Sequence, residues 1–193
     1  MRPVIVALAL VLGGILNGQA GTAAPEKLPA EIYVFTSPAC SHCATYHREL
    51  LPQLKARFVQ TGQARLYEVD LPYDKRSLQV VRLADCMPAV VRGVFQDRIF
   101  AHQDTWAWDE KAVWRNLIEQ DALAAGFSVE AQNACLARAD TERTIIQRRD
   151  EMARRYRISA TPTTVVVRGK QQKKFVGADE SVLSDIATFL EKP

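Results

Sequence analysis

The hydrophobic positions in the first part of the chain predict a strand, a helix and a second strand. Residues 31–35 are rich in β-branched and aromatic side chains, as in a buried strand. Apolar residues then recur at helical spacing, at Leu50, Leu51, Leu54 and Phe58. This helix should end just before Gly62, and Pro52 inside it predicts a kink at residues 48–52. Because residues 65–70 resemble a strand again, we expect a βαβ unit with two parallel strands.

The middle of the chain, residues 74–157, changes to helical periodicity with almost no strand signal. We predict four helices there, at about 75–92, 109–125, 128–139 and 141–157. Asp109, Ser128 and Thr141 are candidate N-caps, and Gly126 is a candidate stop. This block interrupts the alternation of strands and helices.

The last part of the chain returns to β-structure. A strand at 163–168, a turn at 169–171 and a second strand at 173–176 predict an antiparallel hairpin. A final helix should begin at Asp179 or Ser181 and run to Leu190. Pro162 stands at the start of the hairpin, where a residue without an N–H is tolerated. A cis Thr161–Pro162 bond would leave the Thr161 backbone free to pair with an incoming peptide beside Cys40.

Residues 1–24 have the pattern of a secretory signal peptide. Arg2 precedes an apolar run, residues 4–16, that is short for a membrane span. Two small-residue cleavage boxes follow, Gly18-Gln19-Ala20 and Thr22-Ala23-Ala24. An uncleaved N-terminal anchor is the alternative. In either case we expect the domain at residues 25–193 to be exported.

Composition adds little to this picture. About 169 residues would remain after cleavage at Ala24, enough for one domain with a substantial core. The formal net charge is +3, and Arg2 would leave with the signal peptide. So small a charge gives no reason to expect nucleic acid as a partner.

The candidate chemistry lies where the first strand turns into the first helix, at Cys40 and Cys43. The first turn of a helix has free N–H groups and the positive end of the dipole, which favour a thiolate. Two residues of spacing bring the thiols within disulfide range, with Cys40 as the attacking and Cys43 as the resolving thiol. His42 can stabilise a Cys40 thiolate, and each pKa unit of stabilisation is worth about 30 mV in a two-electron couple.

Other uses of this C-x-x-C pair are possible. Residue 44 is alanine, which excludes the C-x-x-C-H motif of c-type haem attachment. A zinc site usually needs a second C-x-x-C or an H-x-x-x-H pair, and the sequence has neither. A structural disulfide or a metal site stays an alternative to redox chemistry, which requires no bound cofactor.

The remaining cysteines, Cys86 and Cys135, fall in the helical block. In an oxidising compartment their simplest fate is a disulfide with each other. The closed loop of about 50 residues would contribute roughly 3–5 kcal/mol in the chain-entropy model. A second redox pair is the alternative.

Three further features have a structural and a functional interpretation. A tryptophan cluster can be core or an exposed docking surface: Trp106, Trp108 and Trp114. The arginines at 138–157 can form a solvated face with i,i+4 ion pairs, or a patch for acidic clients or lipid headgroups. His102 is expected to be a loop or surface residue without a role in the redox chemistry.

The order of strand, C-x-x-C helix, strand, helical block, Thr-Pro, hairpin and helix resembles an α/β thioredoxin fold with a helical insertion at about 74–157. It is similar to the DsbA-like family of exported thiol-disulfide oxidoreductases. The matching motifs are residues 37–43, residues 160–163 and the hairpin that ends at Gly177.

The resemblance implies a role for each matched residue. Cys40 would be the nucleophile, His42 its stabiliser, Cys43 the resolving thiol and Pro162 the cis-proline that faces the disulfide. The pair Cys86–Cys135 is similar to a second disulfide found in the helical domain of some bacterial members.

The sequence also departs from the family pattern. Val34 stands where many thioredoxin-like proteins have a buried acid, so Glu31 and His47 become candidates for proton transfer at the resolving thiol. Strong oxidants of the family have Pro-His between the cysteines, whereas Ser41 precedes the histidine here. Thr161, before the cis-proline, is similar to members that isomerise or reduce disulfides, so the direction of the reaction stays open.

We therefore predict a periplasmic, monomeric dithiol oxidase that acts on exported proteins with free cysteines. The resemblance implies regeneration by a membrane quinone-linked thiol oxidase. The alternatives are a disulfide isomerase or reductase of the same fold, a non-catalytic chaperone, or a copper-binding module that uses Cys40, Cys43 and His47.

Overall fold

The structure, a computed structural model, describes residues 29–108 and 113–191 of the chain. A four-stranded sheet forms its centre, with strand order β2-β1-β3-β4. The strands are β1 (Ala30–Thr36), β2 (Ala64–Asp70), β3 (Thr163–Arg168) and β4 (Gln171–Val176). β1 and β2 are parallel, and the β3–β4 hairpin is antiparallel, so both strand predictions are confirmed. β4 begins two residues earlier than expected.

One helical stretch follows Cys40 and alternates between α-helical and π-helical turns. Its parts are α1 (Ser41–Thr45), η1 (Tyr46–Leu50), α2 (Leu51–Leu54) and η2 (Lys55–Val59). The predicted helix is therefore present. Its irregularity before Pro52 takes the form of η1, where the Leu51 N–H bonds to the Tyr46 carbonyl five residues back. The second π-helical turn was not expected.

The helical block contains more helices than the periodicity predicted. They are α3 (Lys75–Ala84), α4 (Ala89–Ala101), α5 (Gln103–Trp106), α6 (Trp114–Ala124), α7 (Val129–Leu136) and α8 (Thr141–Tyr156). The single helix expected at 75–92 is wrong, because Pro88 lacks an N–H and serves as the N-cap of a separate helix, α4. The last helix is α9 (Ser181–Glu191).

The predicted helix ends are partly correct. The Ser128 side chain accepts a hydrogen bond from the Ala131 N–H, and Gly126 follows α6 with φ of +96°. Thr141 is the first residue of α8 rather than its N-cap, because Asp140 occupies that position. Asp109 lies outside the described residues. Arg157 ends α8 in the left-handed conformation, with φ of +52°.

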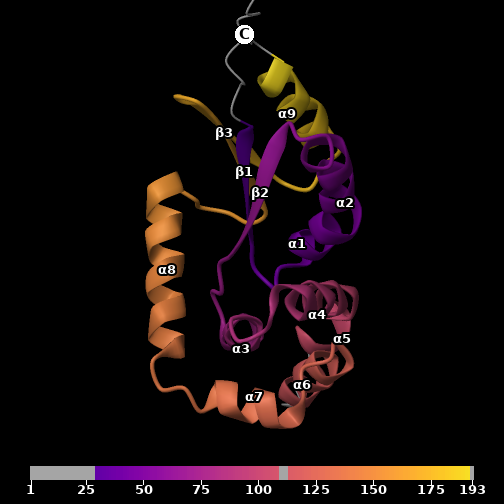
Figure 1. Ribbon diagram of the computed structural model, residues 1–193, viewed down its shortest axis with the longest axis vertical. Helices are drawn as coiled ribbons and strands as arrows, with labels where there is room; N and C mark the ends of the chain where they lie inside the picture. Colours follow the sequence, from indigo (N-terminus) through magenta and orange to yellow (C-terminus); the bar gives the residue numbers. More distant parts are fainter. Residues whose placement is uncertain (1–28, 109–112, 192–193) are drawn as a thin grey trace, which may run out of the picture.

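The two faces of the sheet are covered by different helices. The face with Ile32 and Val34 packs against α2 and α9, whereas the face with Phe35 packs against Tyr156 of α8. Figure 1 shows α8 on one side of the sheet and α1, α2 and α9 on the other, with α3 to α7 gathered beyond the end of the sheet that leads to α1. The helical insertion therefore lies against the turn that carries Cys40.

The insertion has its own core, which accounts for the tryptophans. Trp106 is fully buried, and Trp114 packs against the same cluster, whereas Trp108 is 59% exposed. The cluster is therefore mainly core. In the arginine-rich α8, Arg148 does not pair along its helix but reaches Asp85 at the end of α3, at 2.7 Å.

The predicted signal peptide, residues 1–24, lies outside the described residues. Within the part of the chain that the structure describes, none of the helices is long and apolar enough to cross a membrane.

Candidate active site

Cys40 is the N-cap of α1, at the end of a tight turn that leaves β1. Its backbone is extended, with φ −85° and ψ 118°. The Cys40 N–H donates to the Ser37 carbonyl at 3.0 Å, which closes the turn of residues 37–40. The Cys40 carbonyl accepts the N–H groups of Cys43 and Ala44, at 3.0 and 3.1 Å. The sulfur therefore lies beside the free N–H groups of the first helical turn.

The two thiols have opposite acidities. Cys40 is partly exposed, Cys43 is buried, and both are free thiols. The hydrogen bond from the Cys43 thiol, helped by the Thr161 side chain and by the N–H groups of Cys43 and His42, lowers the pKa of Cys40 to about 5, against the opposing effect of burial. The same hydrogen bond and burial raise the pKa of Cys43 far above its ordinary value. Cys40 is therefore the nucleophilic thiolate at neutral pH, and Cys43 is its protonated neighbour.

The Thr161–Pro162 peptide bond is cis and faces Cys40. The Cys40 sulfur lies 3.5 Å from the Thr161 carbonyl oxygen. Pro162 is buried, and its carbonyl accepts the Gly177 N–H at 3.0 Å, which ties it to the end of the hairpin. The structure thus brings Cys40, Cys43, Thr161 and Pro162 together. The pairing of Thr161 with an incoming peptide stays a prediction.

His42 is exposed at the start of α1. Its contribution to the low pKa of Cys40 comes from its backbone N–H. A stabilising role for the imidazole therefore stays a prediction.

The candidates for proton transfer at Cys43 differ in position. Glu31 lies at the far end of β1, where it accepts a hydrogen bond from the Tyr33 hydroxyl at 2.9 Å. His47 is one turn beyond Cys43 and stacks on Phe100, with ring centroids 4.5 Å apart. Burial lowers the pKa of His47, so its imidazole is neutral at pH 7.

Two polar residues of the insertion, which were not predicted from the sequence, hold the turn of residues 37–40, here called the redox turn. The Ser77 hydroxyl on α3 accepts the Ala39 N–H at 3.1 Å and donates to Asp74 at 2.6 Å. The Gln103 amide on α5 donates to the carbonyls of Pro38 and Cys40, at 2.6 and 3.0 Å. A polar residue in a helical pattern is usually exposed, and only the tertiary contacts distinguish these two.

His102 has a structural partner that the sequence did not reveal. Its side chain is 47% exposed, as expected for a surface position, but Nδ1 lies 2.9 Å from a carboxylate oxygen of the buried Asp121. Arg98 donates to the same oxygen at 3.0 Å. These side chains fix the junction of α4 and α5 against α6.

The alternatives for the C-x-x-C pair can be compared with the geometry. Among residues 29–108 and 113–191, the structure brings together no group of three His, Cys, Asp or Glu side chains that could hold a metal ion. The copper alternative with Cys40, Cys43 and His47 therefore finds no support in the described residues.

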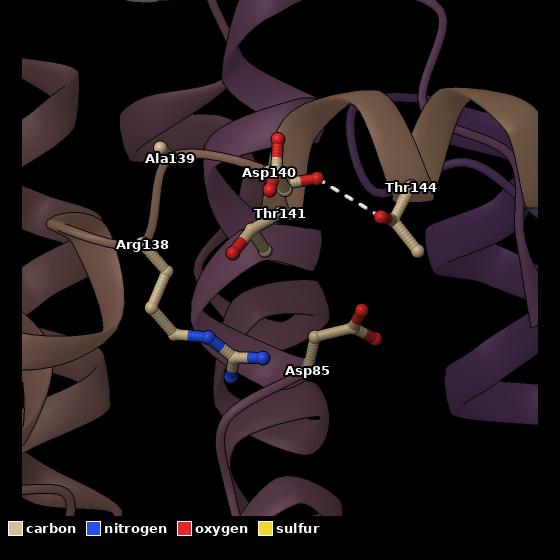
Figure 2. Close-up of a pocket in the computed structure, with 6 residues that line it drawn as sticks. All are labelled: Asp85, Arg138, Ala139, Asp140, Thr141 and Thr144. Carbon is tan, nitrogen blue, oxygen red and sulfur yellow. Dashed lines mark hydrogen bonds between the residues drawn. The ribbon is translucent and has the colours of Figure 1, made fainter.

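Cys86 and Cys135 form a disulfide that joins the end of α3 to α7. Arg138 Nη1 lies 3.4 Å from Cys86 Sγ, and Cys135 Sγ lies 3.1 Å from the Arg82 carbonyl oxygen. A pocket of about 320 Å³ adjoins this disulfide. Figure 2 shows its lining side chains, from Asp85, Arg138, Ala139, Asp140, Thr141 and Thr144. It belongs to the insertion and not to the surroundings of Cys40.

Comparison with protein families and curated proteins gives consistent matches. A family model described as Thioredoxin matches residues 24–181. The chain is similar to a proposed protein-disulfide oxidoreductase of Rickettsia typhi, RT0103, with 28% identity over 142 residues, which cover 73% of this chain and 52% of that protein. A Rickettsia felis protein of the same description is 28% identical over 142 residues, which cover 73% of this chain and 50% of that protein. The chain spans about half the length of the curated relatives it matches.

Solved structures match over most of the chain. Wolbachia pipientis alpha-DsbA1 has a TM-score of 0.74 at 20% identity, covering 87% of this chain and 92% of that one. Oxidised BdbD from Bacillus subtilis has a TM-score of 0.69 at 15% identity, covering 86% and 90%. At these identities the likeness concerns the fold, and it confirms the predicted thioredoxin-like arrangement.

Proposed function

The chain belongs to the thioredoxin family, and from this premise we propose that it is a thiol-disulfide oxidoreductase that oxidises proteins with free cysteines. The observation that carries the proposal is the placement of its two thiols, with Cys40 at the N-cap of α1 beside the cis Thr161–Pro162 bond and Cys43 buried. Cys40 is partly exposed and has a pKa lowered to about 5, whereas Cys43 is buried and protonated. A thiolate stabilised in the reduced form makes the corresponding disulfide a better oxidant.

The proposed reaction begins with an oxidised Cys40–Cys43 bond. A client thiolate attacks Cys40 Sγ, the more accessible sulfur, so a client–Cys40 bond forms and the bond to Cys43 breaks. Cys43 leaves as a thiolate and takes up a proton, in keeping with its raised pKa. The product of this step is a mixed disulfide at Cys40.

The second step releases the client. Another client thiolate attacks the client's own sulfur in the mixed disulfide, and Cys40 leaves as a thiolate. The client has then lost two electrons and gained a disulfide, and the Cys40–Cys43 pair has gained them. Cys40 is a good leaving group because its thiolate accepts hydrogen bonds from Cys43 and the Thr161 side chain.

Regeneration requires an oxidant, for which we propose a membrane quinone-linked thiol oxidase. We also propose that the protein is an exported, periplasmic monomer. The signal-like sequence of residues 1–24 supports export.

The deciding experiment is the equilibrium reduction potential of Cys40–Cys43 in glutathione buffers, followed by the mass shift after thiol alkylation. A potential near about −120 mV supports the oxidase. A potential at about −200 mV or below supports an isomerase or reductase instead, and Ser41 and Thr161 would be the first residues to test. If no bond forms between the two cysteines at any glutathione ratio, the redox function is wrong.

A further inference from the structure

The contacts of the redox turn point to Gln103 as a positioning residue. We propose that its side-chain amide holds the turn of residues 37–40 in the conformation that stabilises the Cys40 thiolate, so that the helical insertion sets the oxidising strength of the site. This inference rests on the proposed function, because it assigns a determinant to the same redox pair.

The Gln103 side chain is buried and committed to the turn. The residue is 2% exposed, and Nε2 donates to the Pro38 carbonyl at 2.6 Å and to the Cys40 carbonyl at 3.0 Å. A primary amide nitrogen carries two hydrogens, so both donors are used on one turn. Burying an amide is costly unless it is hydrogen-bonded, which makes this pair of contacts specific.

The two hydrogen bonds from Gln103 bear on the acidity of the Cys40 thiol. The Cys40 carbonyl also accepts the N–H groups of Cys43 and Ala44, so Gln103 fixes the residue from which α1 begins. The N–H groups of His42 and Cys43 lower the pKa of Cys40 only while they point at its sulfur. Gln103 further offsets the partial negative charge of the two carbonyl oxygens to which it donates, both of them in the turn that carries Cys40. Loss of its amide would weaken both contributions.

A second element of the insertion, α3, also contacts the turn, but its Ser77 accepts a hydrogen bond where Gln103 donates. The Asp74 carboxylate can only accept, so the Ser77 hydroxyl donates its one hydrogen to Asp74. The Ser77 oxygen then accepts the hydrogen bond from the Ala39 N–H. Ser77 thus holds an N–H of the turn, whereas Gln103 holds two carbonyls. The turn is fixed from α3 and from α5.

The backbone of Gln103 is itself well anchored. Trp106, fully buried in the same short helix, donates from its indole nitrogen to the Ile99 carbonyl at 3.0 Å. His102, the preceding residue, contacts the buried Asp121 of α6. These contacts hold α5 against the core of the insertion. The position of Gln103 therefore depends on how the insertion packs.

The chain offers a matched control for the experiment. Gln132 on α7 is 5% exposed, and its amide also donates to two carbonyls, those of Glu119 and Phe127, at 3.1 and 2.9 Å. It belongs to the same insertion but lies in α7, at the end of the molecule away from α1 (Figure 1). Replacing either glutamine by leucine removes a similar pair of buried hydrogen bonds.

We would compare the wild type with Gln103→Leu and Gln132→Leu. The two readouts are the pKa of Cys40, from the pH dependence of its alkylation in the reduced protein, and the equilibrium constant with glutathione. In Gln103→Leu the pKa should rise by about half a unit to one unit, and the disulfide should become about three- to tenfold harder to reduce. Gln132→Leu should change thermal stability alone.

A second variant covers the case in which Gln103→Leu does not fold. Gln103→Glu keeps the shape, and a protonated buried carboxyl group can still donate one hydrogen bond, so its Cys40 pKa should lie between those of the wild type and the leucine variant. Unchanged Cys40 pKa and equilibrium constant in the folded Gln103 variants would overturn the inference, as would an equal shift in Gln132→Leu. Failure of the wild type to form the Cys40–Cys43 disulfide would instead overturn the proposed function, since the pKa is measured on the reduced protein.

Discussion

The backbone N–H of Ser37 donates to Cys43 Sγ at 3.4 Å, which gives the buried sulfur a polar partner at the start of the turn of residues 37–40. This hydrogen bond opposes the large rise in the pKa of Cys43. Val34, where many thioredoxin-like proteins have an acid, is buried and apolar. A Cys43 thiolate that forms when a client attacks Cys40 therefore meets a backbone N–H already in place.

The two cysteines should differ sharply on substitution. Cys40→Ser should abolish disulfide transfer, because it removes the only partly exposed sulfur of the pair. Cys43→Ser should accumulate mixed disulfides at Cys40, because no resolving thiol is present. Non-reducing electrophoresis with a client that contains a disulfide distinguishes the two, with the Cys86→Ser/Cys135→Ser protein as a control. The Cys40 thiolate of Cys43→Ser attacks the client disulfide, forms a bond to one client sulfur and releases the other as a thiolate. Normal turnover by Cys40→Ser would contradict the assignment of Cys40 as the reactive thiol.

The acidity of Cys40 predicts how the stability of the reduced protein depends on pH. The pKa of Cys40 is about 5 in the folded reduced protein, whereas an unfolded thiol has a pKa of about 8.5. A lowered folded pKa stabilises the fold above the unfolded pKa, and this contribution is lost as the pH falls through the folded pKa. The reduced protein should therefore lose stability relative to the oxidised form from about pH 8.5 to about pH 5. Urea unfolding of both forms across this range is the measurement, and a constant difference would contradict the assignment.

The Thr161 hydroxyl can be tested without changing the size of the side chain. Thr161→Val removes the hydrogen bond that lowers the pKa of Cys40 and keeps a β-branched residue before Pro162. The Cys40 pKa should rise, and the disulfide should become about three- to tenfold harder to reduce. Thr144→Val, on α8, is the matched control, since its hydroxyl donates only to the Asp140 carbonyl. A more oxidising Thr161→Val protein would show that the hydroxyl does not stabilise the thiolate.

His42→Ala distinguishes the contribution of the His42 imidazole from that of the His42 backbone N–H. The substitution keeps the N–H that lowers the pKa of Cys40, so any change reports the side chain. We expect a disulfide that is harder to reduce, because the imidazole can no longer offer the thiolate a hydrogen bond or a positive charge. The potential against glutathione decides it, and an unchanged value would leave the backbone N–H as the whole contribution of His42.

The second disulfide should resist thiol exchange. Attack on the more accessible Cys86 sulfur would expel Cys135, which is buried beside the Arg82 carbonyl oxygen and would be a poor thiolate. Attack on Cys135, which would release a Cys86 thiolate beside Arg138, is blocked by burial. Mass spectrometry during glutathione titration should show Cys40–Cys43 reduced well before Cys86–Cys135. Simultaneous reduction of both would contradict this order.

Removal of the second disulfide tests its contribution to stability. The Cys86→Ala/Cys135→Ala protein should lose about 3–5 kcal/mol in its free energy of unfolding, as expected for a closed loop of this length. Chemical denaturation measures the loss. A stability equal to that of the parent would mean that the bond does not constrain the unfolded chain.

The sequence predicted what depends on local pattern and missed what depends on tertiary contact. Strand periodicity and the spacing of Cys40 and Cys43 indicated the βαβ unit and the position of the redox pair, and the resemblance to the DsbA-like family implied the cis Thr161–Pro162 bond. The separate helix α4 was missed because Pro88 was read within a longer helix. Gln103 and Ser77 could not be found, since a buried glutamine has the same pattern as an exposed one until its partners are known.

One of the groups that lower the pKa of Cys40, the Thr161 side chain, lies 121 residues further along the chain. A chain that emerges from its N-terminus presents Cys40 and Cys43 before Ser77, Gln103 and Thr161 have followed. While the emerging chain is unfolded, Cys40 has the acidity of an ordinary thiol, and the contribution of Thr161 is the last to arrive. The cysteines of the nascent chain can therefore still pair wrongly with one another, and Cys40 gains its full reactivity only when Thr161 has been made and has folded beside it.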